Sequence, residues 1–214
     1  MTTIYDLLMR LPFLGWVLLC AVAQLATLTH LSAQSVDFVF VIHIAMRLST
    51  IAFMLLAASA VILRSPPTGK SSGLEPRISA LTGTFLIYAV LLFPRRDLSL
   101  TEEIISTLLT MIGNAGALIA LSQLGRSFSI MAESRRLVTT GPYRFVRHPL
   151  YVAEEIATIG MFLQYDLQWA VLVLAAHIAL QLRRMHNEEL VLTAQFPEYA
   201  AYQRTTARLI PGVY

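Results

Sequence analysis

Long runs without charged residues dominate the chain, and its few charged positions divide it into segments. Four of these runs, one interrupted only by Arg47, are long enough for a membrane-spanning helix of about 20 mostly apolar residues. We therefore predict four transmembrane helices, at about residues 11–31, 38–63, 78–94 and 104–122.

A fifth apolar region follows, in which Asp166 is the one charge between residues 156 and 182. A single pass here would put the basic residues after it on the opposite side of the membrane from most of the others. The excess of Lys and Arg in cytoplasmic segments therefore favours a transmembrane helical hairpin, with limbs at 149–165 and 167–187. Asp166 stands where it can cap the second limb.

The amino-acid composition is typical of an integral membrane protein. The 214 residues are 56% hydrophobic and only 14% charged, against about 25% charged in soluble domains. High hydrophobicity excludes intrinsic disorder, and a single cysteine excludes a disulfide-stapled secreted scaffold. We predict an all-α, polytopic integral membrane protein.

The basic residues also set an orientation. With both termini in the cytoplasm, every Lys and Arg except Arg47, Arg95 and Arg96 lies on the cytoplasmic side. We therefore predict cytoplasmic N- and C-termini. We divide the chain into spanning helices at 1–122 and a core at 123–214, which ends in a cytoplasmic helix.

Two polar elements stand out in this core. Residues 141–151 read GPYRFVRHPLY, and Pro149 is suited to the first turn of a helix. After the hairpin come Arg184, the pair Glu188-Glu189, a Tyr-x-x-Tyr and a late Ile-Pro. Arg184 and Glu188 are four residues apart, so they share one helix face.

These elements resemble the isoprenylcysteine carboxyl methyltransferase family, integral membrane enzymes that use S-adenosylmethionine and are related to phospholipid methyltransferases. The resemblance spans about residues 125–211. It implies a methyltransferase in which Arg147, His148, Tyr151 and the glutamate pair line the cofactor site. The chain departs from the family after Tyr151, where we expect a small residue such as glycine and find Ala153 followed by Glu154-Glu155.

The residue types suit this cofactor. A guanidinium binds a carboxylate with two hydrogen bonds, which favours Arg147 for the cofactor carboxylate. Glu188 or Glu189 suits its ammonium or ribose, and tyrosines suit its sulfonium or adenine. We predict Arg147 and Glu189 as catalytic residues. The predicted cofactor-binding set is Tyr143, Arg147, His148, Pro149, Tyr151, Arg184, Glu188, Glu189 and Tyr199.

The expected acceptor is lipophilic and enters from the bilayer: an isoprenylcysteine-type carboxylate, a lipid or a small hydrophobic molecule. A carboxylate needs no base, whereas a thiol or phenol would need one, and Glu154, Glu155 and His186 are the candidates. The predicted acceptor-site residues are His43, Arg47, Glu154 and Glu155. His43 and Arg47 have a second interpretation, as structural partners of Asp37, Glu154 or Glu155. No metal-ligand spacing is visible, and nucleic-acid binding is not expected.

Two other classes stay open. A membrane reductase of sterol-like or enone lipids would bind NADPH, with Arg135, Arg136 and Arg144 available for its extra phosphate. A non-catalytic scaffold or small transporter would use His43 and Arg47 as its interior polar site. Binding assays with S-adenosylmethionine and with a dinucleotide distinguish the methyltransferase, the reductase and the non-catalytic protein.

Overall fold

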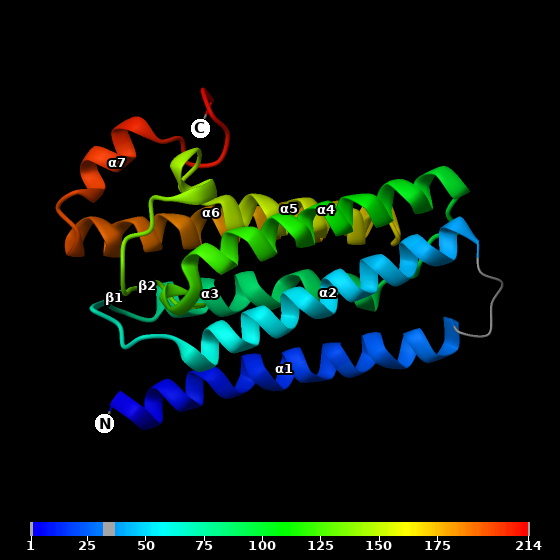
Figure 1. Ribbon diagram of the computed structural model, residues 1–214, viewed down its shortest axis with the longest axis horizontal. Helices are drawn as coiled ribbons and strands as arrows, with labels where there is room; N and C mark the ends of the chain where they lie inside the picture. The colour runs from blue at the N-terminus through cyan, green and yellow to red at the C-terminus, as the bar shows by residue number, and fades with distance from the viewer. Residues whose placement is uncertain (1, 32–36, 214) are drawn as a thin grey trace.

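The computed structural model describes the backbone of residues 2–31 and 37–213, and the side chains of residues 10–27 and 37–213. Long helices lie side by side in a bundle (Figure 1). The α-helices are α1 (Thr2–Leu31), α2 (Phe38–Leu63), α3 (Glu75–Phe85), α4 (Leu100–Leu124), α5 (Pro149–Phe162), α6 (Leu167–Gln195) and α7 (Tyr199–Thr205). Three 3₁₀ helices, η1 (Leu86–Leu92), η2 (Gly125–Ser127) and η3 (Gly141–Arg144), and two paired strands, β1 (Gly69–Lys70) and β2 (Glu133–Ser134), complete it.

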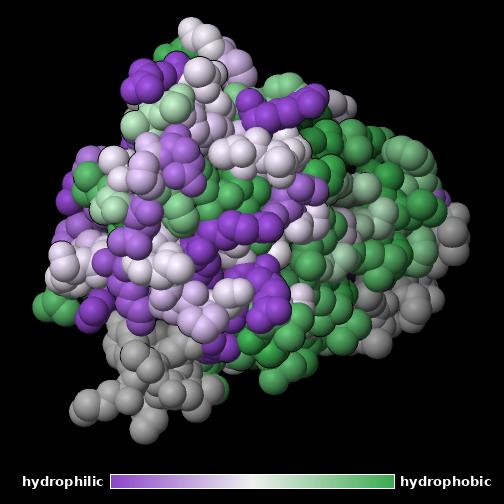
Figure 2. All heavy atoms as spheres, turned by 60° about the vertical axis from the view of Figure 1, so that its left-hand side comes forward, coloured by the Kyte–Doolittle hydropathy of each residue, from purple (hydrophilic) through white to green (hydrophobic). Residues whose placement is uncertain are grey.

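The surface agrees with a bilayer environment. Among the described residues, three helices are long and apolar enough to cross a membrane, with spans at Arg10–Thr27, Phe38–Leu63 and Leu100–Ser127. Large apolar side chains on the flanks are open to the outside, among them Leu18, Ile119 and Leu172. Figure 2 shows hydrophilic side chains gathered at one end of the bundle and hydrophobic ones along its flank. We call the hydrophilic end, which holds β1, β2 and α7, the polar end.

The expected helix at 78–94 differs from the prediction. That range begins in α3 and continues as the 3₁₀ helix η1, so it is not one regular α-helix. Just before the change, the hydroxyls of Thr82 and Thr84 donate to the carbonyls of Ile78 and Ala80 at 2.6 and 2.8 Å. Such bonds compete with the helical ladder and bend helices, which the count of apolar residues did not reveal.

Helices α5 and α6 are joined by a short turn, as the predicted hairpin requires, but neither is among the three described helices that are long and apolar enough to cross a membrane. Helix α5 begins at Pro149 as predicted, and α6 begins at Leu167, with the Asp166 carboxylate accepting from the Gln168 amide at 3.1 Å. The turn between them pairs with the segment after η1, since the Asp166 amide donates to the Pro94 carbonyl at 3.0 Å. Helix α6 then extends well past the expected limb, to Gln195.

Helix α5 packs closely against α4 because small residues face each other. A Cβ on Gly113 would lie 2.7 Å from the Ala153 carbonyl oxygen, and one on Gly160 would lie 2.7 Å from the Ser106 carbonyl oxygen. The Ser106 hydroxyl donates to the Gly160 carbonyl at 2.8 Å. Small residues and buried polar contacts of this kind hold helices together where lipid removes the hydrophobic drive.

Helix α4 also holds α2. The side-chain amide of Asn114 donates to the hydroxyls of Ser49 and Thr50 at 3.2 and 2.8 Å. Asn114 is buried, so these bonds satisfy a polar group in the apolar part of the bundle. Helix α4 is therefore the central support of the fold, with α2 and α5 fixed on either side of it.

We predict that Gly113→Leu destabilises the protein by about 1–3 kcal/mol, because overpacking of a close interface carries a cost of this size. Thermal unfolding in detergent measures the change. The control is Gly15→Ala, where the added Cβ meets nothing within 4 Å. Equal melting temperatures for the two variants would contradict the close α4–α5 contact.

Candidate active site

The carboxylate of Glu189 on α6 joins three basic side chains at the polar end. Its Oε1 accepts from Arg147 Nε at 2.9 Å and lies 3.1 Å from His148 Nε2. Its Oε2 accepts from Arg208 at 2.6 Å. Glu189 and His148 are both buried. One glutamate therefore ties the segment before α5 and the C-terminal segment to α6.

Backbone pairing reinforces this junction. The amides of Arg147 and His148 donate to the carbonyls of Ala207 and Arg208 at 2.8 and 3.1 Å. The Arg147 Nη1 donates to the carbonyl of Gln203 at 3.1 Å and to that of Thr206. The segment around residue 207 thus runs beside the Arg-His-Pro sequence and fixes the Arg147 side chain.

The electrostatics of Glu189 follow from these contacts. Burial by itself would raise the pKa of this carboxyl, but hydrogen bonds from His148, Arg208 and Arg147 outweigh burial and lower the pKa to about 2. Glu189 is therefore a stable anion, and it compensates the charge of the two arginines.

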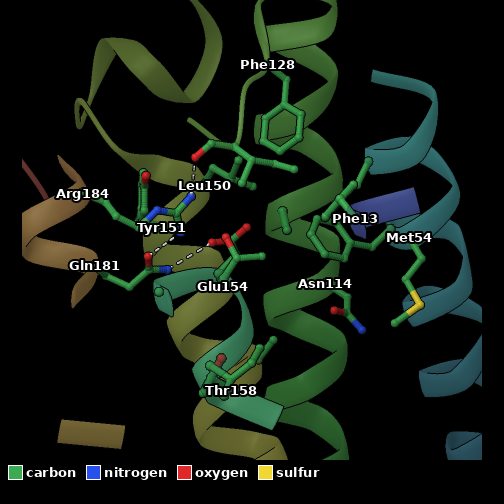
Figure 3. A pocket seen from close by; sticks show the side chains of 18 of the residues that line it. Phe13, Met54, Asn114, Phe128, Leu150, Tyr151, Glu154, Thr158, Gln181 and Arg184 are labelled. Carbon is green, nitrogen blue, oxygen red and sulfur yellow. Dashed lines mark hydrogen bonds between the residues drawn. The ribbon is translucent and has the colours of Figure 1, made fainter. Parts of the chain in front are cut away.

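A cavity of about 670 Å³ begins beside this junction and continues between the helices. Its polar part is lined by Tyr143, Arg147, His148, Tyr151, Arg184, Glu188, Tyr199 and Tyr202. Most of the side chains of α1, α2 and α4 that line the rest are apolar, including Phe13, Val17, Phe53, Met54 and Ala117, and we call this the apolar part, although Gln24, Arg47 and Asn114 also line it. Figure 3 shows both parts in one view, with Tyr151 and Arg184 on one side and Phe13 and Met54 on the other.

Two hydroxyls at the polar part have no hydrogen-bond partner among the described residues. Tyr143 and Tyr199 are buried and line the cavity, and neither phenol is bonded within the protein. Burial raises the pKa of both phenols, so they stay protonated. Unpaired buried donors are costly, so each is available to a polar ligand in the cavity.

Other polar groups of the cavity are engaged with one another. The Tyr151 hydroxyl donates to Glu188, and the Arg184 guanidinium lies 5.2 Å from the centre of the Tyr151 ring. Arg184 also donates to Gln181 at 2.7 Å and to the Ile130 carbonyl at 3.3 Å. Gly83 leaves room for this side chain, because a Cβ there would lie 2.7 Å from Arg184 Cδ.

The structure brings most of the predicted site residues to this one cavity. Those that line it are Arg47, Tyr143, Arg147, His148, Tyr151, Glu154, Arg184, Glu188 and Tyr199. Pro149, Glu189, His43 and Glu155 are not among the lining residues. Pro149 starts α5. Both Glu189 oxygens are taken by protein donors, so within this structure Glu189 acts on the site by holding Arg147 and His148.

The predicted structural partners of His43 and Arg47, which were Asp37, Glu154 or Glu155, are wrong. His43 Nε2 lies 3.2 Å from a carboxylate oxygen of Glu103, and Arg47 Nη1 donates to Gln24 at 2.8 Å. Asp37 instead accepts from the Phe40 amide at the start of α2. Both true partners lie on neighbouring helices, which local spacing does not indicate.

Sequence reasoning missed Arg208 and Gln181. Arg208 contacts Glu189 from 19 residues away, and Gln181 links Arg184 to Glu154 across two helices. Neither residue has a distinctive local pattern. Arg135, one of the residues available for an NADPH phosphate in the reductase alternative, pairs with Glu133 at 2.7 Å and lines the cavity.

Comparisons with known proteins identify a related family over part of the chain. Residues 105–194 match the model of the isoprenylcysteine carboxyl methyltransferase (ICMT) family. This confirms the resemblance for the segment that holds α5, the hairpin turn and nearly all of α6.

Two curated proteins are also similar. The cobalt-zinc-cadmium resistance protein CzcN of Cupriavidus metallidurans is 34% identical over 112 residues, which cover 50% of this chain and 51% of CzcN. The nickel-cobalt-cadmium resistance protein NccN of Alcaligenes xylosoxydans xylosoxydans is 32% identical over 116 residues, which cover 50% of this chain and 52% of NccN. The chain thus spans about half the length of the curated relatives it matches.

We predict that Glu189 contributes to acid stability. Its pKa of about 2 lies below the usual 4.5, so its stabilising effect is complete above about pH 4.5 and is lost as the pH falls through about 2. The free energy of unfolding of the wild type should therefore fall over this range by more than that of Glu189→Gln. Denaturant unfolding at a series of pH values measures the difference. The exposed Glu198 supplies the control Glu198→Gln, and a variant Glu189→Gln with the wild-type slope would refute the assignment.

Proposed function

We propose, with the ICMT family match as the premise, that this chain is a membrane methyltransferase that uses S-adenosylmethionine and acts on a lipophilic acceptor. The observation that carries the proposal is the single cavity of about 670 Å³, whose polar part contains the family motif residues and whose apolar part lies among α1, α2 and α4.

The polar part fits the cofactor. S-adenosylmethionine has a carboxylate, an ammonium, ribose hydroxyls and an adenine, and it supplies an electrophilic methyl group on a sulfonium. Arg147 is suited to the carboxylate, because Glu189 uses its Nε and the backbone carbonyls use Nη1, which leaves Nη2. Glu188 is suited to the ammonium. The unpaired phenols of Tyr143 and Tyr199 are suited to the ribose or adenine.

The protein's part in methyl transfer is to align two ligands and to exclude water. The tyrosine rings and the buried Arg184 close the polar part, and the apolar side chains of α1 and α2 separate the rest of the cavity from water. Apolar side chains are exposed along the flank of the bundle, so we propose that the bilayer surrounds this flank and supplies the lipophilic acceptor. We propose that the polar end faces the cytoplasm, because it collects the basic residues.

The names of the two relatives describe resistance to metal cations, which is a cellular role and not a reaction. They name no acceptor. If this chain shares such a role, we propose that it does so through methyl transfer to a membrane component.

We predict that S-adenosylhomocysteine binds the detergent-purified protein in the micromolar range and that Tyr199→Phe and Tyr143→Phe each weaken binding about fivefold to tenfold. The reason is the loss of one hydrogen bond to the ligand, worth about 1 kcal/mol. Neither variant should lower the melting temperature, because neither hydroxyl has a hydrogen-bond partner among the residues that the structure describes. Calorimetry and thermal unfolding measure the two effects.

The matched control is Tyr202→Phe, whose hydroxyl donates to the Tyr143 carbonyl. This variant should lose stability. Binding of NADPH without binding of S-adenosylhomocysteine would contradict the proposal and favour a reductase. Binding of neither by the folded protein would favour a non-catalytic role.

A further inference from the structure

The carboxylates around the cavity differ in what they are bonded to. Glu133 pairs with Arg135, Glu188 accepts from Tyr151, and Glu155 lies 3.1 Å from His177. Glu154 lines the cavity, yet within the described residues no Lys, Arg or His nitrogen lies within 4.0 Å of its carboxylate. In the described part of the chain, its one hydrogen-bond donor is the Gln181 side-chain amide, at 3.4 Å.

Glu154 stands where the two parts of the cavity meet. It lies three residues after Tyr151 on α5, so it is about one helical turn further from the polar end. Figure 3 shows its carboxylate between Gln181 and Arg184 on one side and Asn114 and Met54 on the other. Gln181 donates to Glu154 and accepts from Arg184 at 2.7 Å, and this bridge orients the carboxylate.

We propose that Glu154 selects an acceptor whose reacting group carries a proton, such as a phenol, amine or thiol, and that it takes this proton during methylation. The inference rests on the proposed function. It assigns to this chain an acceptor class different from the carboxylate of the family's namesake substrate.

The carboxylate of Glu154 favours an acceptor that carries a proton on its reacting group. A carboxylate acceptor has no hydrogen to donate to the Glu154 carboxylate, and two neighbouring carboxylates in a cavity of low dielectric cannot both be ionised without a large cost. A hydroxyl, an N–H or an S–H instead donates a hydrogen bond to the same oxygen. Glu154 has a free oxygen for it, because Gln181 engages only Oε2.

The fate of the proton during methyl transfer also favours an acceptor that carries a proton. The acceptor heteroatom forms the new bond to the methyl carbon, and the electron pair of the broken methyl–sulfur bond stays on sulfur. The acceptor's proton passes to the Glu154 carboxylate. A carboxylate acceptor releases no proton, so a base would have no task there.

The other candidate bases do not fit. Glu155 is not among the residues that line the cavity; its carboxylate lies 3.1 Å from His177, although neither of its oxygens has a hydrogen-bond partner among the described residues. His186 is exposed and lies outside the lining as well. The geometry therefore selects Glu154 from the three candidates that the sequence left open.

Three probes with one apolar chain test the proposal: para-hexylphenol, para-hexylaniline and para-hexylbenzoate. Binding to the protein saturated with S-adenosylhomocysteine is measured by calorimetry, and methyl transfer is measured with labelled S-adenosylmethionine. The wild type should bind the phenol and aniline at least tenfold more tightly than the benzoate. Glu154→Gln keeps the side-chain shape and should reduce methylation of the phenol about 100-fold or more, while its affinity for the benzoate rises.

The matched control is Glu155→Gln, which should keep the wild-type order of the three probes. Equal or tighter binding of the benzoate by the wild type would overturn the proposal, and so would a Glu154→Gln variant that behaves as Glu155→Gln does. If Glu154→Gln weakens S-adenosylhomocysteine itself tenfold, Glu154 is a cofactor residue and the proposal is again overturned. If the wild type does not bind S-adenosylhomocysteine, the proposed function is refuted. The role of Glu154 is then tested separately, by the order in which the protein binds the three probes without cofactor.

Discussion

The junction at Glu189 is the interaction on which the site depends. Its carboxylate receives Arg147 and His148 from the segment before α5 and Arg208 from the C-terminal segment. Removal of this one acceptor would take from Arg147 and Arg208 the buried carboxylate that they share, and the loss of one partner from a buried ion pair typically costs several kcal/mol. Tyr199 and Tyr202, which follow α6, are held over the cavity by the same arrangement.

A second constraint comes from helix packing. Gly113 and Gly160 bring α4 and α5 into backbone contact, and Asn114 fixes α2 on the other side of α4. The cavity then lies between rigid helices, with its polar part next to the Glu189 junction and its apolar part toward the lipid-facing helices. The cavity therefore has a polar part and an apolar part, as the proposed transfer of a methyl group from a polar cofactor to a lipophilic acceptor requires.

Much of this could be predicted from the sequence because its strongest signals are local. The uncharged runs predict α1, α2 and α4, and Pro149 and Asp166 mark the helix starts of the hairpin. The RHPxY run and the Glu188-Glu189 pair indicate the polar part of the cavity. The 3₁₀ helix η1 could not be predicted, since hydropathy does not distinguish it from an α-helix and the hydroxyl bonds of Thr82 and Thr84 that precede it are visible only in the structure.

Contacts across long sequence separations account for the other differences. Arg208 reaches Glu189 because the C-terminal segment folds back beside Arg147, and His43 pairs with Glu103 on another helix. Spacing within one helix carries no information about such partners. Local spacing also cannot distinguish the roles of Glu188 and Glu189. These residues are adjacent on α6, but Glu188 faces the cavity and Glu189 faces Arg147 and Arg208.

An experimental structure with S-adenosylhomocysteine tests the central claim most directly. We predict that the ligand lies in the polar part of the cavity, with polar contacts to Tyr143, Tyr199 and Glu188 and its sulfur directed toward Glu154. Glu189 should keep its bonds to Arg147, His148 and Arg208. A ligand bound outside this cavity, or one bonded to Glu189 in place of these basic residues, would contradict it.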